Sequence, residues 1–256
     1  MTAYHGGKQK IGKNITKIIY DESKDIEEDK DFIIKGYCEP FCGMLGVYQH
    51  IPELFKNYKP KLKYKAGDTN ESVIMMWNEA KKGWKPPTHI TETKYNTLKT
   101  SKDSALKGYA GHQYSFGGQY FKGYAPKYGG VLKNSQTVID KISNIGSIMD
   151  KSNTTFSYGD YTQYSNLKNY IIYCDPPYIG TTQQTYKNSF DSNSFYNWCR
   201  KMSEDNIIFT SEYKAPKDFE EIWSKNTKVT GKNISEKYGK GNSSNRCEKL
   251  YVVKKK

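Results

Sequence analysis

Short apolar runs recur along the 256-residue chain, and each is bounded by turn-forming or acidic residues. Four runs have the length of buried strands, and they cover residues 32–38, 170–174, 206–211 and 249–253. Between these runs, apolar positions recur at helical spacing over residues 47–55, 72–82, 136–149 and 194–202. Strands that alternate with helices predict an α/β domain built around a largely parallel sheet.

Ligands of such sheets bind outside the carboxyl ends of the strands, so the residues that follow each run are the first candidates for a functional site. Three runs are followed by polar or glycine-bearing segments, which are residues 39–46 (EPFCGMLG), 175–178 (DPPY) and 211–213 (SEY). We therefore expect these three segments to meet at one edge of the sheet.

The segment Asp175-Pro176-Pro177-Tyr178 carries the most specific chemistry. Two consecutive prolines have no backbone N–H, so they end the strand in a rigid extended shape whose carbonyls remain free to accept hydrogen bonds. An acid, an acceptor carbonyl and an aromatic ring suit a planar group that bears an exocyclic amine. Asp175 and the Pro176 carbonyl can each accept from the amine, and Tyr178 can stack on the ring.

The turn at residues 39–46 suits a nucleotide-like cofactor, because its glycines permit a tight turn and close approach of a ligand. It matches neither the G-x-G-x-x-G fingerprint nor the phosphate loop, so a phosphate-bearing cofactor is not favoured. Asp68 follows 22 residues after Gly46, where an acid at the end of a second strand would bind ribose hydroxyls. An ordinary surface turn is the alternative for Asp68.

The formal net charge is +13, and it is unevenly distributed. The net charge is zero over residues 1–80, +8 over 81–133, −3 over 134–224 and +8 over 225–256. Two basic blocks of this size indicate a polyanionic partner. Only two of the 40 basic residues are arginine, which favours single-point phosphate contacts over bidentate recognition of guanine. A coding sequence rich in A and T is an alternative cause of the lysine bias.

The first basic block, from Trp84 to Lys133, shows little helical periodicity but interleaves lysines with glycines and aromatic residues. Lysines can contact phosphates while aromatic rings stack on bases. The residues predicted to bind DNA are Lys94, Lys107, Tyr114, Lys122, Tyr124 and Lys127. The alternative is an irregular glycine-rich segment whose aromatic residues form a small core of their own.

Other functional classes are disfavoured. The first residues lack the apolar segment of a signal peptide, and no run approaches the roughly 18 apolar residues of a membrane helix, so we expect an intracellular protein without a membrane partner. The five cysteines include no C-x₂-C pair and the four histidines are scattered. Neither a disulfide framework nor a metal site is expected.

Four features, in order, resemble the DNA adenine-N6 methyltransferases of the alpha group, the family of the Dam methylase. They are the segment Tyr4-His5-Gly6-Gly7-Lys8, the segment Glu39-Pro40-Phe41-Cys42-Gly43, a basic insert, and the segment Asp175-Pro176-Pro177-Tyr178. The resemblance implies a class I S-adenosylmethionine-dependent methyltransferase fold, which is Rossmann-like with a mostly parallel sheet. It further implies a catalytic domain over 1–80 and 134–256, with a target-recognition insert over 81–133.

The resemblance also implies roles for individual residues. The residues it assigns to S-adenosylmethionine are Tyr4, Lys8, Glu39, Phe41, Gly43, Asp68, Asp160, Tyr161 and Asp175. The chain departs from the family at two positions: Leu45 stands where the family usually has a second glycine, and Tyr4 stands where it often has tryptophan. We expect Leu45 to shift the turn around the methionine moiety of the cofactor.

The implied activity is transfer of a methyl group to the N6 amine of an adenine flipped out of double-stranded DNA, with Asp175, Pro176, Pro177 and Tyr178 as the catalytic segment. The enzyme is expected to act as a monomer, with a dimer as the alternative. Methylation of cytosine N4 or of adenine in RNA would use the same chemistry, and a DNA-binding module without catalysis is the non-enzymatic alternative. C5-cytosine methylation is disfavoured because no Pro-Cys dipeptide occurs. Glutamine-N5 methylation is disfavoured because Asp175 stands where such enzymes normally carry asparagine.

Overall fold

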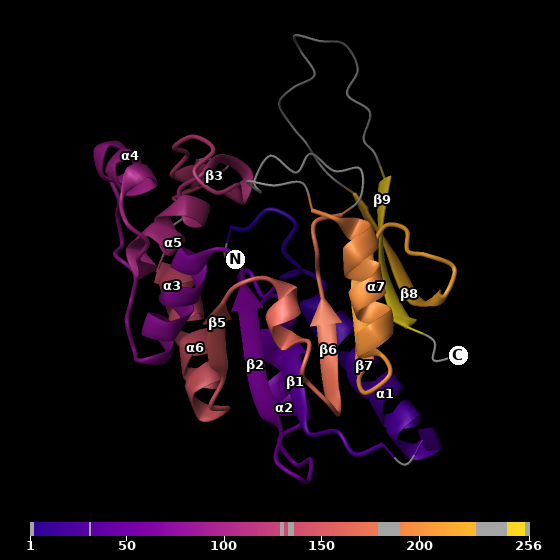
Figure 1. Cartoon of the computed structure of the whole chain (residues 1–256). Helices are drawn as coiled ribbons and strands as arrows, with labels where there is room; N and C mark the ends of the chain where they lie inside the picture. The colour runs from indigo at the N-terminus through magenta and orange to yellow at the C-terminus, as the bar shows by residue number, and fades with distance from the viewer. Residues whose placement is uncertain are drawn as a thin grey trace.

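The computed structural model describes residues 3–30, 32–128, 131–132, 136–178, 190–228 and 245–253. A seven-stranded sheet forms the centre of this part of the chain (Figure 1). In sheet order its strands are β5 (Thr155–Tyr158), β2 (Lys63–Asp68), β1 (Gly36–Glu39), β6 (Tyr170–Cys174), β7 (Ile207–Glu212), β9 (Asn245–Val253) and β8 (Phe219–Lys228). The first five strands are parallel, and β9 pairs antiparallel with both β7 and β8. The predicted fold class, a Rossmann-like α/β domain with a mostly parallel sheet, is confirmed.

Helices cover both faces of the sheet (Figure 1). They are α1 (Gly12–Lys30), α2 (Ile51–Leu54), α3 (Glu71–Lys81), α4 (Glu92–Thr100), α5 (Ala105–Gln113), α6 (Gln136–Lys151) and α7 (Ser192–Met202). Short 3₁₀ helices are η1 (Tyr48–His50), η2 (Phe116–Gly118) and η3 (Tyr161–Tyr164), and a two-stranded hairpin pairs β3 (Lys127–Tyr128) with β4 (Val131–Leu132).

The side chains of β6 alternate between two cores, as expected for a central strand with both faces covered. Ile171 belongs to the core that contains Ile15 and Ile19 of α1, and the next residue, Ile172, belongs to the core that contains Phe195 of α7. All five residues of β6 are buried, which explains why this strand is a continuous apolar run in the sequence.

The basic insert is more regular than its sequence indicates, because it contains the helices α4 and α5. Each helix begins at a side-chain cap: Thr91 accepts from the backbone N–H of Lys94, and Ser104 accepts from that of Lys107. Tyr95 is buried in α4 together with other aromatic side chains of the insert, within the same core that contains α3 and α6. The alternative of an irregular segment with a small core of its own does not hold, because most aromatic rings of the insert belong to or pack against the core that contains α3 and α6.

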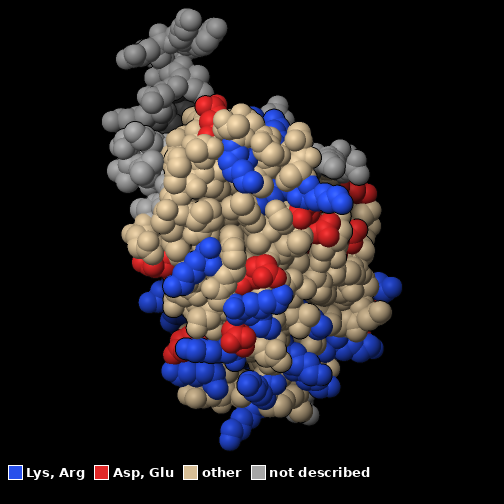
Figure 2. Space-filling view, turned by 90° about the vertical axis from the view of Figure 1, so that its left-hand side faces the viewer, with Lys and Arg blue, Asp and Glu red and all other residues tan. Residues whose placement is uncertain are grey.

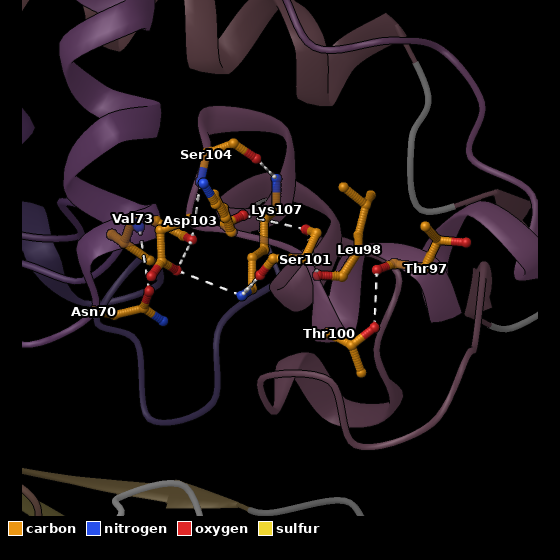
Figure 3. Close-up of polar contacts among 11 residues, drawn as sticks. Asn70, Val73, Thr97, Leu98, Thr100, Ser101, Asp103, Ser104 and Lys107 are labelled. Carbon is orange, nitrogen blue, oxygen red and sulfur yellow. Dashed lines mark hydrogen bonds and ion pairs between the residues drawn. The ribbon is translucent and has the colours of Figure 1, made fainter.

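A polar network fixes the insert to α3 (Figure 3). The Ser72 hydroxyl donates to Asp103 at 2.5 Å and accepts from the backbone N–H of Ser104 at 3.3 Å. The Lys107 ammonium donates to the Ser101 carbonyl at 2.5 Å and lies 3.6 Å from Asp103. These bonds join α3 to the loop between α4 and α5, so the insert is packed firmly against the rest of the molecule.

Two classes of feature are missing from the described ranges. None of the helices placed there has both the length and the apolar character needed to cross a membrane. The same ranges hold no group of three or more His, Cys, Asp or Glu side chains arranged to hold a metal ion.

Candidate active site

The carboxyl ends of β2, β1, β6 and β7 lie side by side, and the residues that follow them line a cavity of about 470 Å³. The chain passes from β1 to β2 on one side and from β6 to β7 on the other, so the connections diverge between β1 and β6. Ligands of open α/β sheets bind at this kind of divergence. Glu39 ends β1 and Asp175 follows β6, which places both acids there.

Most of the predicted cofactor and catalytic residues meet in this cavity. Its lining includes Tyr4, Lys8, Glu39, Phe41, Gly43, Asp68, Lys122, Asp175, Pro176, Pro177 and Tyr178. Tyr213, from the segment that follows β7, also lines it, so all three segments singled out in the sequence contribute to one site.

A buried charge cluster lies at the centre of the cavity. The Lys8 ammonium donates to both carboxylate oxygens of Asp175, at 2.8 and 3.0 Å, and lies 3.7 Å from Oε2 of Glu248. The same ammonium is 4.8 Å from the centroid of the Tyr178 ring, and the Tyr178 hydroxyl donates to Glu248 at 2.9 Å. Glu248 was not predicted as a site residue, because nothing local in the sequence connects β9 with the three segments.

Burial and charge act in opposite directions on this cluster. Burial lowers the pKa of Lys8, but the negative charges of Asp175 and Glu248 outweigh it and hold that pKa above its ordinary value. Lys8 is therefore an ammonium at neutral pH. Burial raises the pKa of Asp175, and the nearby Lys8 charge opposes this shift without cancelling it.

The turn after β1 is fixed from two sides at Gly43. Its N–H donates to Asp68 at 2.9 Å, and its carbonyl accepts from the indole N–H of Trp77 at 2.8 Å. Two residues later, Leu45 has φ +53°, in the left-handed region that glycine normally occupies, and its side chain is fully buried. The backbone thus keeps a glycine-like path at Leu45 despite the side chain.

Asp68 is buried at the end of β2 and holds the neighbouring backbone. One of its oxygens accepts from Gly43, and the other accepts from the N–H of Asn70 at 2.8 Å. Burial raises the pKa of Asp68, and these backbone bonds oppose the shift. Each carboxylate oxygen has a second lone pair, so Asp68 can still accept hydrogen bonds from ligand hydroxyls.

Glu39 is almost completely buried and accepts from the Tyr37 hydroxyl at 2.7 Å. Burial raises its pKa well above the ordinary value. Nearby, the Phe41 ring stacks on Tyr161 with centroids 5.7 Å apart, so Tyr161 lies behind the cavity wall. Asp160 is exposed and caps η3 by accepting from Thr162. Neither Asp160 nor Tyr161 lines the cavity itself.

The predicted DNA-binding residues differ in how far their side chains are exposed. Lys94 is exposed on α4, and Lys122 is exposed while also lining the cavity. In contrast, the Tyr114 ring is fully buried, and only 12% of the Lys107 side chain is exposed, with its ammonium held inside the insert. Neither residue presents its functional group at the surface in this structure, so we no longer include Tyr114 and Lys107 among the proposed DNA contacts.

The other two predicted DNA-binding residues are Tyr124 and Lys127. The Tyr124 hydroxyl donates to the Ile90 carbonyl at 2.7 Å, and its ring stacks on Tyr114, so this partly buried residue supports the fold of the insert. Lys127 lies in β3, but its side chain lies outside the described residues.

Basic side chains on one face of the molecule lie mostly away from the cavity. Figure 2 shows the face on the left of Figure 1, where basic side chains gather mainly over the lower half. The carboxyl ends of the parallel strands point upward in Figure 1, and the two views share their vertical axis. Much of the basic surface on this face therefore lies below the level of the candidate site.

Comparisons with known proteins add little to this description. No protein-family model and no curated protein sequence matches the chain. Among solved structures, one of the rRNA methyltransferase aviRa from Streptomyces viridochromogenes is 10% identical with a TM-score of 0.34, covering 87% of this chain and 77% of that chain. A second structure of that protein is 9% identical with a TM-score of 0.33, covering 86% and 76%. Similarity this low carries no argument about function.

Proposed function

We propose that this protein is an S-adenosylmethionine-dependent methyltransferase that modifies the N6 amine of an adenine flipped out of double-stranded DNA. One observation carries the proposal: Asp175-Pro176-Pro177-Tyr178 follows β6 where the sheet connections diverge, and it lines a cavity with three further acids. This arrangement offers hydrogen-bond acceptors to an exocyclic amine beside a pocket for a second ligand.

The residues present fit S-adenosylmethionine. The cavity of about 470 Å³ has the size of small-molecule sites, which span roughly 300–1,000 Å³. Asp68 has spare lone pairs for ribose hydroxyls, and Phe41 offers an aromatic face at the cavity wall. Acidic side chains line the cavity, and a carboxylate such as Asp175 or Asp68 suits a ligand with a positive sulfonium. When bound, this cofactor supplies an electrophilic methyl group.

The catalytic segment would activate the amine by orienting it. The N6 lone pair of adenine is delocalised into the ring, so the amine is a poor nucleophile. Asp175 and the Pro176 carbonyl would accept hydrogen bonds from the two N6 hydrogens and direct the lone pair toward the methyl group for in-line transfer. No covalent bond to the protein is required.

The target base must leave the helical stack to enter this cavity, and unstacking costs a few kcal/mol. Tyr178 and Tyr213 both line the cavity, with ring centroids 4.6 Å apart and planes at 89°. The Tyr178 ring would replace part of the lost stacking. Lys122, exposed at the cavity, and Lys94, exposed on α4, would contact phosphates on the approach of the DNA.

A direct experiment is incubation of the purified protein with labelled S-adenosylmethionine and, in parallel, mixed-sequence double-stranded DNA, single-stranded DNA and RNA. We expect N6-methyladenine in the double-stranded DNA, identified with its sequence context by single-molecule sequencing. Modified cytosine N4, or modification of RNA alone, would replace the DNA adenine assignment. Failure to bind S-adenosylmethionine while DNA is bound would favour a module without catalysis.

The acid itself can be tested by Asp175→Asn, which keeps the shape of the side chain and removes its charge. We expect methyl transfer to fall by at least about 10³-fold, because the amine loses a charged acceptor in a buried site. The matched control is Asp150→Asn, an exposed acid of α6 outside the cavity lining, which should retain wild-type activity. Normal transfer by the Asp175 variant would overturn the proposed role.

A further inference from the structure

The Lys8 ammonium contacts both carboxylate oxygens of Asp175, at 2.8 and 3.0 Å. These are the atoms that the proposed function requires as acceptors for the substrate amine. A cation that bridges both oxygens competes directly with an incoming N–H donor. Lys8 therefore occupies one lone pair on each oxygen of Asp175 and weakens both oxygens as acceptors, so the amine would bind more strongly if Lys8 moved toward another partner.

Glu248 is the alternative partner. Its Oε2 lies 3.7 Å from the Lys8 ammonium, and only 17% of its side chain is exposed. Charge-assisted hydrogen bonds are formed at about 2.7–2.9 Å, so a displacement of roughly 1 Å would give Lys8 a full bond to Glu248. The lysine stem has several rotatable bonds over which this movement can be distributed, and the ammonium also donates to the Gly6 carbonyl at 3.0 Å in the position described here.

Charge balance explains why a second acid is needed. Lys8 is 5% exposed. If its ammonium moved away from Asp175 and no other anion were near, a buried positive charge would have no partner, which is strongly unfavourable. With Glu248 present, Lys8 stays paired in both positions. The negative charge of Glu248 also raises the pKa of Lys8, in keeping with an electrostatic contact that already operates in this structure.

The fold holds Glu248 in place independently of Lys8. Glu248 lies in β9, which is paired on one side with β7 and on the other with β8, where its partner in register is Lys225. The Tyr178 hydroxyl also donates to Oε2 of Glu248 at 2.9 Å. The acceptor is therefore held by the sheet and by Tyr178, so a change of partner requires Lys8 to move.

We infer that Glu248 is a positioning residue that draws the Lys8 ammonium away from Asp175 when an exocyclic amine enters the cavity. The inference rests on the proposed function, because it concerns how the amine gains access to Asp175. It assigns a role in the site to β9, which the sequence motifs leave without one.

A double-mutant cycle tests the inference, with Glu248→Gln and Lys8→Met made singly and together and methyl transfer measured in single turnover. We expect Glu248→Gln to slow transfer about tenfold or more while Lys8 is present. In the Lys8→Met background the same change should slow transfer less than about threefold, because no cation then covers Asp175. Equal losses in the two backgrounds would overturn the inference.

The pH profile is a second readout, which a purely structural role would not change. The Glu248 charge raises the pKa of Asp175, so its removal in Glu248→Gln should move the acidic limb of the rate profile to lower pH. An unmoved limb would count against Glu248 as an electrostatic partner, even if Lys8→Met proves inactive.

The matched control is Glu221→Gln, since Glu221 pairs with Lys249 on the neighbouring strand at 2.6 Å, outside the cavity. This variant should behave as the wild type in both rate and pH profile. The two proposals fail differently: absence of methyl transfer by the wild type contradicts the proposed function, whereas an active wild type with an additive cycle contradicts only the role of Glu248.

Discussion

His112 shows how strongly burial sets the chemistry of a single side chain in this protein. It is 4% exposed, its Nδ1 lies 2.9 Å from the Gly118 carbonyl oxygen, and its ring is 4.6 Å from that of Tyr4 and 4.9 Å from that of Tyr120. Burial lowers the pKa of His112 to about 4, with the Gly118 bond opposing the shift. The imidazole is therefore neutral at physiological pH, and it supports Tyr4 at the cavity wall.

This depressed pKa predicts a pH-dependent loss of stability. An unfolded histidine has a pKa near 6.5, so its stabilising contribution is fully present above that pH and is lost as the pH falls toward 4. The loss between pH 7 and pH 4 amounts to about 3 kcal/mol from this residue. In His112→Gln, urea unfolding should show a pH dependence weaker by about this amount.

The control for that measurement is His89→Gln, because His89 is exposed. It should leave the pH dependence of unfolding as in the wild type. An unchanged dependence in His112→Gln would show that His112 is protonated in the folded protein at higher pH than its burial indicates.

At the residue scale, sequence reasoning was most informative where a few adjacent residues carry the chemistry. The place of Asp175 and Tyr178 just beyond a strand end could be predicted because the prolines between them end a strand by their own covalent geometry. Glu248 could not be assigned, because its position depends on the antiparallel insertion of β9 beside β7. Tyr114 was predicted to contact DNA, but its ring is buried. An aromatic residue among lysines can stack on a base or fill a core, and its spacing in the sequence does not distinguish the two.

At the scale of elements, α3 is the helix on which others converge. Gly108 of α5 is so close to α3 that an added Cβ would come within 2.2 Å of the Ser72 carbonyl oxygen, and at Gly146 of α6 the corresponding distance to the Ala80 oxygen is 2.3 Å. The backbones of α5 and α6 therefore approach α3 at positions where only glycine fits.

Gly146→Ala tests this packing against helix propensity. In an exposed helix the change stabilises by about 1 kcal/mol, but here the added methyl would push α6 away from α3. We expect net destabilisation of about 1–3 kcal/mol by urea unfolding. Ser147→Ala, at an exposed position of the same helix, should be neutral or slightly stabilising. Stabilisation of both variants alike would contradict the close contact.

Helices and strands could be predicted from the sequence where their hydrophobic residues follow a regular local pattern. β6 and α6 were expected close to where they occur, because a continuous apolar run and a regular helical pattern identify them. α4 and α5 were missed, since their caps at Thr91 and Ser104 are ordinary residues among many polar ones, and half of their buried residues are tyrosine or glycine. Tertiary packing against α3, rather than propensity, stabilises such helices.

At the scale of the whole molecule, charge counted along the sequence does not give charge in space. The count along the chain gives +8 over residues 81–133, but within that block the ammonium of Lys107 is held inside the insert. On the face in Figure 2, much of the basic side-chain surface lies below the level of the strand ends that form the cavity. Lys122 is the predicted contact residue that combines an exposed side chain with a place in the cavity lining.

The salt dependence of the proposed DNA binding would show which of these surfaces contacts phosphates. Each lysine that contacts a phosphate adds about 0.9 to the magnitude of the slope of log affinity against log salt. Lys122→Gln should therefore reduce that slope by about one. Lys151→Gln is the control, because Lys151 is exposed at the end of α6, just before β5 begins. It therefore lies near the amino ends of the parallel strands, whereas the cavity lies at their carboxyl ends. If only the Lys151 variant reduced the slope, the DNA would bind near the amino ends of the strands and not at the cavity.

The charge cluster of Lys8, Asp175 and Glu248 joins three parts of the chain that are far apart in sequence. Lys8 precedes α1, Asp175 follows β6, and Glu248 comes from β9. During synthesis, the cavity cannot be completed until β9 has left the ribosome and inserted beside β7. A nascent or truncated chain without β9 would keep the proposed catalytic motif while lacking one wall of its pocket, so the proposed methyl transfer would report complete folding.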